Sequence, residues 1–234
     1  MAHIKFDKIG PKEIKIRVQQ NFSGSYLTLI SIIQGVAFGI WYTNVSEIFV
    51  IPDFGIHLLV YPAFSLLSIV LVVFYYSWFV SIIYTPPDFP EAIIPILLAT
   101  FEIAPMYFFN YPNIWWYCVG LFYLTGIIGF LNTIRNIRRN EYCEGTENIK
   151  SAILLELKIN IGILLLMTFL AFWSNATYPI SYNFKNSFPS HDKIFLFVHS
   201  VLIVIMIYKT HKFLNIVFSY SGLRVQDKLP KKVN

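Results

Sequence analysis

Charged residues are scarce in this sequence. Asp, Glu, Lys and Arg together make up 13% of the 234 residues, whereas hydrophobic residues reach 56%. A soluble domain ordinarily carries about 25% charged residues. With half that share, the chain has too little polar surface to cover a globule of this length. The composition therefore excludes an ordinary soluble domain and predicts a polytopic membrane protein.

Cysteine is also scarce, with two residues in the chain. Cys118 falls inside an apolar run and Cys143 in a polar loop, so they cannot build a disulfide framework, and they lack metal-ligand spacing. Free cysteine commonly behaves as a small buried hydrophobe. We therefore expect two free thiols, no metal site and no bound cofactor.

Catalytic motifs are missing as well. The sequence contains no glycine-rich phosphate loop, no G-x-S-x-G, no H-E-x-x-H and no C-x-x-C. Pro189, Ser190 and His191 match a fragment of a membrane lipid-phosphatase loop, but the glycine and the flanking basic elements of that loop are absent. No polar stretch approaches the ~50 residues of an independent domain. These absences predict no catalytic residue and a protein that is not an enzyme.

The sequence does contain a series of apolar runs long enough to form membrane helices. We predict an all-α fold, a bundle of about six transmembrane helices whose third helix is interrupted by proline. The expected spans are residues 26–42, 58–84, 91–109, 114–134, 152–173 and 193–208. A basic N-terminal segment (1–25) and a basic C-terminal tail (209–234) flank this transmembrane domain (26–208). Residues 14–18 alternate apolar and basic side chains, which favours an extended conformation over a helix.

The basic residues predict an orientation. Of 18 lysines and arginines, five precede the first span, four lie between the fourth and fifth, and six follow the sixth. With six crossings these regions share one side, which the positive-inside rule places in the cytoplasm. The loop between the second and third spans is the exception, because it would share that side without a basic residue. We expect both termini in the cytoplasm, a location in the cell membrane, and no nucleic-acid partner.

The third expected span carries the most informative residues. Glu91, Pro95, Glu102 and Pro105 fall on one side of a helix with 3.6 residues per turn. Glu91 lies at the expected helix start, where the helix dipole favours a negative charge. Glu102 lies deep in the apolar run, where an ionisable group usually faces a protein interior or a wet cavity. The two prolines each remove a backbone donor and predict kinks.

Other polar residues in the expected spans are candidates for a pore lining or a proton site. Glu156 and Asn160 share a helix face in the fifth span, whereas Lys158 points nearly the opposite way. The full set of candidates for a pore lining or proton site is Glu102, Glu91, Glu156, Asn160, Asn132 and His199. The aromatic residues 115–117, at the start of the fourth span, predict a belt at the membrane interface.

Two further sets of residues predict contacts. Gly35 and Gly39 form a small-xxx-small pattern that permits close helix packing, within the chain or across a subunit boundary. We expect a homo-oligomer. Basic residues beside the spans predict contacts with anionic lipid headgroups of the bilayer or with a cytoplasmic protein partner. These residues are Arg135, Arg138, Arg139, Lys209 and Lys212.

Three functions are compatible with this pattern. The first is a pore or ion-channel subunit, in which a ring of Glu102 side chains favours cations. The gate of such a pore responds to voltage, to lipid or to a protein partner. A membrane-depolarising effector controlled by a separate partner has this architecture. The second is a non-conducting anchor or partner subunit of a larger complex, with Glu102 paired to Lys158 or His199. The third is a small proton-coupled transporter, because a carboxyl in low dielectric takes up a proton more readily than in water.

Overall fold

The computed structural model describes the backbone of residues 11–50, 59–82, 89–109, 111–139, 147–178 and 190–227. Side chains are described for residues 28–50, 59–71, 75, 93–109, 111–138, 150–178, 193–213 and 215. Within these ranges the chain forms six α-helices and no strand, which confirms the all-α prediction. The helices are α1 (Pro11–Phe49), α2 (Val60–Ile82), α3 (Phe89–Tyr107), α4 (Pro112–Arg139), α5 (Glu147–Thr177) and α6 (Ser190–Asp227).

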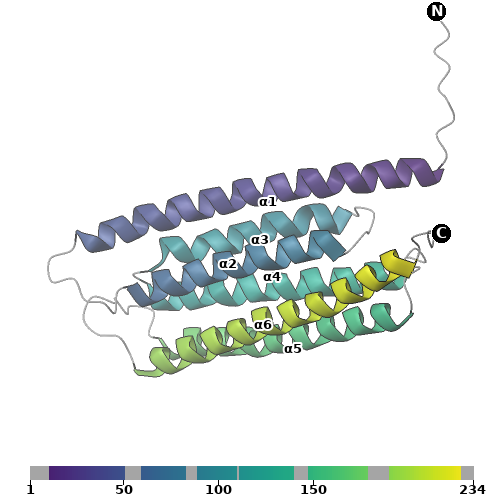
Figure 1. Ribbon diagram of the computed structural model, residues 1–234. Helices are drawn as coiled ribbons and strands as arrows, with labels where there is room; N and C mark the ends of the chain where they lie inside the picture. The colour runs from purple at the N-terminus through teal and green to yellow at the C-terminus, as the bar shows by residue number, and fades with distance from the viewer. Residues whose placement is uncertain are drawn as a thin grey trace, which may run out of the picture.

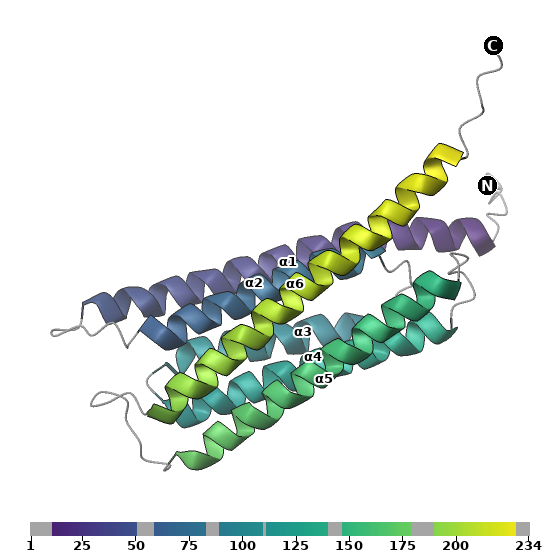
Figure 2. The same cartoon turned by 60° about the horizontal axis from the view of Figure 1, so that its bottom comes forward.

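Five of these helices close a ring, and α1 lies outside it. Around the ring α2 packs on α3, α3 on α4, α4 on α5, α5 on α6, and α6 on α2. The purple helix α1 packs against α2 and α3 (Figure 1). The start of α1 and the end of α6 lie at the same end of the bundle in both ribbon views (Figures 1 and 2).

Four helices are long and apolar enough to cross a membrane. These segments are Thr28–Phe49 of α1, Pro112–Arg138 of α4, Lys150–Thr177 of α5 and Lys193–Phe213 of α6. They contain 21 to 28 residues, and at ~1.5 Å per residue each exceeds a hydrocarbon core of ~30 Å. Among the described residues, α2 and α3 contribute the shorter apolar segments Val60–Leu71 and Ile93–Tyr107. The prediction of a membrane protein is therefore supported.

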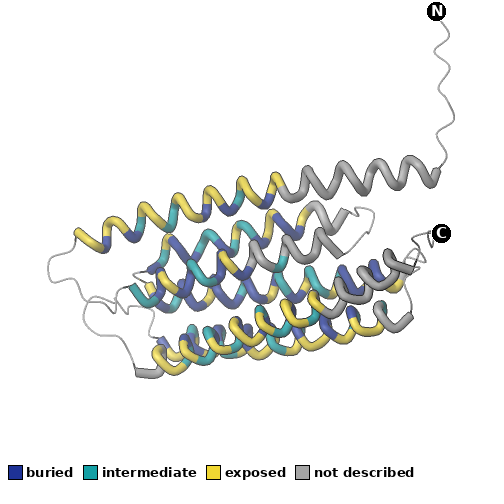
Figure 3. The backbone as a smooth tube through the Cα atoms, viewed as in Figure 1, coloured by how far each residue is buried: buried dark blue, intermediate teal, exposed yellow. Residues whose placement is uncertain are grey.

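The outside of the bundle is apolar as well as the inside. Exposed residues alternate with buried ones along the part of each helix whose side chains are described (Figure 3). Many of the exposed ones are large hydrophobics. Ile32, Phe197 and Val204 are examples, with exposed fractions of 61%, 70% and 58%. A continuous apolar surface is unfavourable in water but is solvated by lipid chains. The surface therefore agrees with a membrane location.

Several helices are longer than the sequence predicted. Helix α1 begins at Pro11 and includes residues 14–18, so the extended conformation expected there is wrong. Helix α6 continues to Asp227, into the expected tail. Once a span has formed a helix, each further residue adds a backbone hydrogen bond without a new nucleation cost. A five-residue alternation is too short a signal to outweigh that continuation.

The centre of the ring is filled by aromatic side chains. Trp115 and Trp116 of α4 are both fully buried, so the interfacial belt expected at residues 115–117 is wrong for these two. Trp115 contacts Tyr61 of α2 at a ring-centroid distance of 4.6 Å and Trp116 at 4.9 Å. Each indole ring buries a large apolar area. Burial between helices therefore removes more apolar surface from water than a position at the membrane interface would.

Both prolines of the third helix lie inside α3, and both are buried. Each lacks a backbone N–H, so the carbonyl group one turn earlier loses its usual helix hydrogen bond. Neighbouring groups must satisfy such carbonyl groups where no water reaches them. The side-chain amide of Asn44 on α1 acts instead at the end of α3. Its Nδ2 donates to the carbonyl oxygen of Met106 over 2.7 Å, and this carbonyl group has no helix donor because α3 ends at Tyr107. The prediction that Pro95 and Pro105 kink the helix stays a prediction.

Candidate functional site

Glu102 lies between α3 and α1, where its exposed fraction is 3%. Its partner is Gln34 of α1, which is 8% exposed. The amide Nε2 of Gln34 donates a hydrogen bond to Oε2 of Glu102 over 2.8 Å. Since a side-chain amide carries no charge, the carboxyl group has a hydrogen-bond donor but no counter-ion in this pair.

Each member of the Gln34–Glu102 pair keeps one buried oxygen atom without a hydrogen-bond partner. Within the described part of the chain, neither Oε1 of Glu102 nor Oε1 of Gln34 meets a donor. A buried acceptor left unpaired costs roughly 1–3 kcal/mol. The pair therefore presents acceptor oxygen atoms that a proton or a cation would stabilise.

Glu102 does not pair with either of the residues suggested by the sequence. Lys158 is exposed on α5, and the ring nitrogens of His199 on α6 face backbone carbonyl groups. The predicted pairing is wrong because Glu102 faces α1. Glu91 lies in α3, but its side chain is outside the described residues. The prediction that its carboxyl group shares a helix face with Glu102, three turns away, stays a prediction.

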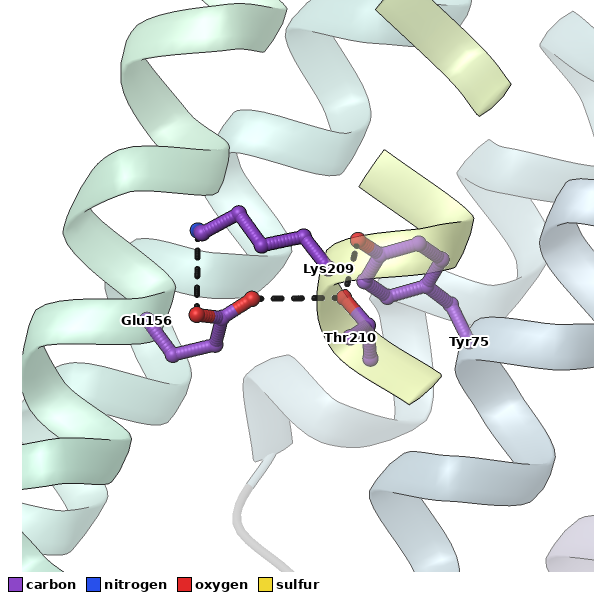
Figure 4. A network of polar contacts seen from close by, with 4 residues as sticks. All are labelled: Tyr75, Glu156, Lys209 and Thr210. Carbon is purple, nitrogen blue, oxygen red and sulfur yellow. Dashed lines mark hydrogen bonds and ion pairs between the residues drawn. The ribbon is translucent and has the colours of Figure 1, made fainter. Parts of the chain in front are cut away.

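A second polar cluster joins α2, α5 and α6. The ammonium Nζ of Lys209 lies 2.9 Å from Oε2 of Glu156. The hydroxyl of Thr210 donates to Oε1 of Glu156 over 3.4 Å and lies 2.8 Å from the hydroxyl of Tyr75. In Figure 4 the two carboxylate oxygens of Glu156 point to these neighbouring residues of α6. Because the Thr210 bond is long, the ion pair is the stronger link.

This cluster is largely enclosed by the bundle. Glu156 and Thr210 are 6% and 0% exposed. One turn along α5, Asn160 is also 0% exposed, and neither its Oδ1 nor its Nδ2 has a hydrogen-bond partner among the described residues. The structure therefore confirms that Glu156 and Asn160 share a buried face. Asn132 of α4 is half-buried and is not one of the residues bonded in this cluster.

His199 is fully buried in α6. The rings around it are those of Phe64, Trp116 and Tyr123, at centroid distances of 6.0, 5.2 and 5.7 Å. Its Nδ1 lies 2.7 Å from the carbonyl oxygen of Phe195, and its Nε2 lies 3.0 Å from that of Met167. A neutral imidazole donates from one nitrogen only. Both carbonyl oxygens therefore receive a hydrogen bond only when the ring is protonated on both nitrogens. Through Met167, His199 links α6 to α5.

No group of three or more His, Cys, Asp and Glu side chains that could hold a metal ion occurs among the residues described. Cys118 is a buried free thiol, as predicted, and Cys143 lies outside the described residues. Comparisons with protein-family models, curated proteins and solved structures find no match. The function is therefore argued from the chemistry of the sites.

The predicted packing glycines lie on the outer side of α1. Gly35 and Gly39 are exposed, and a Cβ atom built on either meets no atom within 4 Å. Close packing at these glycines within the described chain is therefore excluded, whereas a contact with another subunit stays a prediction.

The predicted basic contact residues fall into two groups. Arg135, Arg138 and Lys212 are exposed, as a lipid or partner contact requires. Lys209 instead forms the ion pair with Glu156. The side chain of Arg139 lies outside the described residues.

The partner residues in both polar sites were not predictable from spacing within one helix, because they lie on other helices. Gln34 is a polar residue inside an expected span, a signal that was visible but not connected with Glu102. Lys209 was assigned to the C-terminal tail, because it directly follows the last expected span, and Thr210 was not singled out. In the structure α6 continues through both residues, and they reach Glu156 from consecutive positions.

Proposed function

We propose that this chain is a six-pass integral membrane protein and a subunit of an ion pore, in which a cation crosses the bilayer by way of the Gln34–Glu102 pair. The observation that supports this proposal is the position of Glu102. It is a carboxyl group enclosed in an apolar bundle, with a neutral partner and an unpaired oxygen atom. Ionisable groups at such depth are costly and commonly mark ion or proton pathways.

The six-pass topology is supported by α2 and α3. Helix α2 has 23 residues, none of them charged, and α3 has 19 residues. At ~1.5 Å per residue their lengths are about 35 and 28 Å, close to the ~30 Å hydrocarbon core. An even number of crossings agrees with the start of α1 and the end of α6 lying at one end of the bundle. The basic residues favour the cytoplasm for that end.

The environment of Glu102 favours a pathway through each subunit. Its carboxyl group faces α1 of its own chain and is almost completely enclosed. A ring of Glu102 side chains around an axis between subunits would require this group on the outer surface. The site proposed for the cation is therefore the α1–α3 interface of each protomer, whatever the oligomeric state.

The test is ion flux through the purified chain in liposomes. Glu102→Gln keeps the shape and hydrogen-bonding capacity of the side chain and removes its charge, so cation flux falls to the level of empty vesicles. Glu47→Gln is the matched control, because Glu47 is an exposed carboxylate on α1; its flux equals that of the wild type. Equal flux in Glu102→Gln and the wild type would contradict the proposal.

The second candidate is a non-conducting partner subunit. The observation that favours it is the same hydrogen bond viewed as a structural link, since Gln34 and Glu102 attach the peripheral helix α1 to the ring. In that case the wild type carries no flux of any ion. Replacement of Glu102 by leucine then lowers thermal stability, measured by size-exclusion chromatography after heating, without any other functional change.

A further inference from the structure

Building on the proposed function, we infer that the ion carried is a proton, and that the side-chain amide of Gln34 provides a hydrogen bond to Glu102 in both protonation states of the carboxyl group. The number of available ligand atoms favours a proton over a metal ion. The pair offers two unpaired oxygen atoms. Mg²⁺ takes six ligands and Ca²⁺ six to eight, and a K⁺ filter replaces a whole hydration shell with carbonyl oxygens. A proton needs one acceptor.

The packing of the interior supports the same ion. One turn from Gln34 on α1, Ile30 and Ala37 are buried, and one turn from Glu102 on α3, Leu98 and Met106 are buried. A hydrated metal ion cannot pass through such packing without large side-chain movements. A proton moves by short transfers along hydrogen-bonded water molecules that enter transiently, so it needs no permanently open channel.

The amide of Gln34 suits both states of Glu102. The ionised carboxylate accepts the hydrogen bond from Nε2, as observed. After proton uptake the carboxyl group becomes an O–H donor and requires an acceptor. Rotation about the last side-chain torsion, which is broad and roughly two-fold, exchanges the positions of Nε2 and Oε1. Oε1 of Gln34, which has no partner in the observed state, then accepts from Glu102.

The proton step itself is balanced. The Glu102 carboxylate takes a proton from hydronium on one side of the membrane; an O–H bond of hydronium breaks, the O–H bond of the neutral carboxyl group forms, and water remains. The carboxyl O–H bond then breaks as the proton passes to water on the other side, which becomes hydronium. No electron is transferred and no other bond changes.

The charge of Glu102 is not compensated by neighbouring groups of the described chain. Glu102 makes a single hydrogen bond, to Gln34, and no ion pair. The titratable residues described on α3 and on the helices that pack against it are Tyr42 and Glu47 of α1, Tyr61 and Tyr75 of α2, Tyr107 of α3, and Tyr117, Cys118, Tyr123, Arg135 and Arg138 of α4. None of them is bonded to Glu102. Gln34 is therefore the group that responds when Glu102 changes its protonation state.

The experiment uses the full chain in liposomes loaded with a pH-sensitive dye. A pH gradient drives proton flux, and parallel vesicles carry Na⁺ or K⁺ gradients instead. We expect proton flux in the wild type and in Glu47→Gln, and a loss to the background of empty vesicles in Glu102→Gln. Gln34→Leu lowers the flux, since both protonation states lose their hydrogen bond. Infrared difference spectra between high and low pH show a protonated carboxyl band that is missing in Glu102→Gln.

The outcomes separate this inference from the proposed function. Flux of Na⁺ or K⁺ that requires Glu102, without proton flux, overturns the inference and leaves the ion pore standing. Proton flux that is unchanged in Glu102→Gln overturns the assignment of the site. Wild-type flux in Gln34→Leu overturns the role of the amide. No flux of any ion, from protein that is monodisperse and helical by circular dichroism, overturns the proposed function and the inference with it.

Discussion

The ion pair between Glu156 and Lys209 allows a quantitative test of the second polar cluster. Glu156 is 7% exposed in its side chain and Lys209 is 29% exposed. The change to make is Lys209→Met, which keeps the apolar stem and removes the charge. Glu156 is then left as a buried carboxylate whose remaining partner is Thr210, at 3.4 Å.

The size of the effect follows from this geometry. Removing one partner of a fully buried ion pair costs about 3–5 kcal/mol. The Nζ atom of Lys209 is itself buried, although part of its side chain is exposed, so we expect a loss at the lower end of this range, about 3 kcal/mol. Glu156→Gln costs less, about 1 kcal/mol, because Lys209 can turn toward water and the amide still accepts from Thr210. The double variant carries two neutral side chains and loses about 1 kcal/mol, less than Lys209→Met alone.

The assay is the free energy of unfolding of the four proteins in bilayer nanodiscs, measured as a complete double-mutant cycle. Lys212→Met is the control, because Lys212 is an exposed lysine on the same helix; its stability matches that of the wild type. The reasoning is refuted if the double variant is less stable than Lys209→Met, or if the two single losses add without coupling.

Two further predictions concern packing and hydrogen bonding. Gly120→Ala lowers the thermal denaturation midpoint, because the new Cβ lies 2.8 Å from Cε1 of Phe172 and overpacking costs about 1–3 kcal/mol. Gly39→Ala is the control and does not lower the midpoint, because no atom lies within 4 Å of its Cβ. Equal midpoints for these two variants would contradict the α4–α5 contact. Tyr75→Phe removes a 2.8 Å hydrogen bond to Thr210 and lowers the unfolding free energy by about 1 kcal/mol; Thr210→Val, which also loses the bond to Glu156, lowers it further in the same nanodisc assay.

Features that depend on local composition and periodicity were predictable from the sequence. The low share of charged residues indicated a membrane protein, and the apolar runs located all six helices. The i, i+4 spacing placed Glu156 and Asn160 on one face, and the structure buries that face. Helix ends were less predictable, because a helix continues beyond the apolar run that identifies it, as α6 does to Asp227.

Contacts between distant parts of the chain were not predictable in this way. The hydrogen bond of Gln34 to Glu102 spans 68 positions and that of Thr210 to Glu156 spans 54. Spacing within a helix says which side a residue faces, but not which helix lies there. The small-residue pattern at Gly35 has the same weakness, since it indicates a surface for close approach without naming the partner.

The peripheral position of α1 has a consequence for how the protein is made. Helix α1 leaves the ribosome before α2 and α3, so the groups that it bonds, Pro62, Glu102 and Met106, are synthesised later. Until α3 arrives, the amide of Gln34 must enter the bilayer unpaired or remain near the headgroups. Helix α1 therefore takes its final place only after α3 has been made, and its docking completes the site around Glu102.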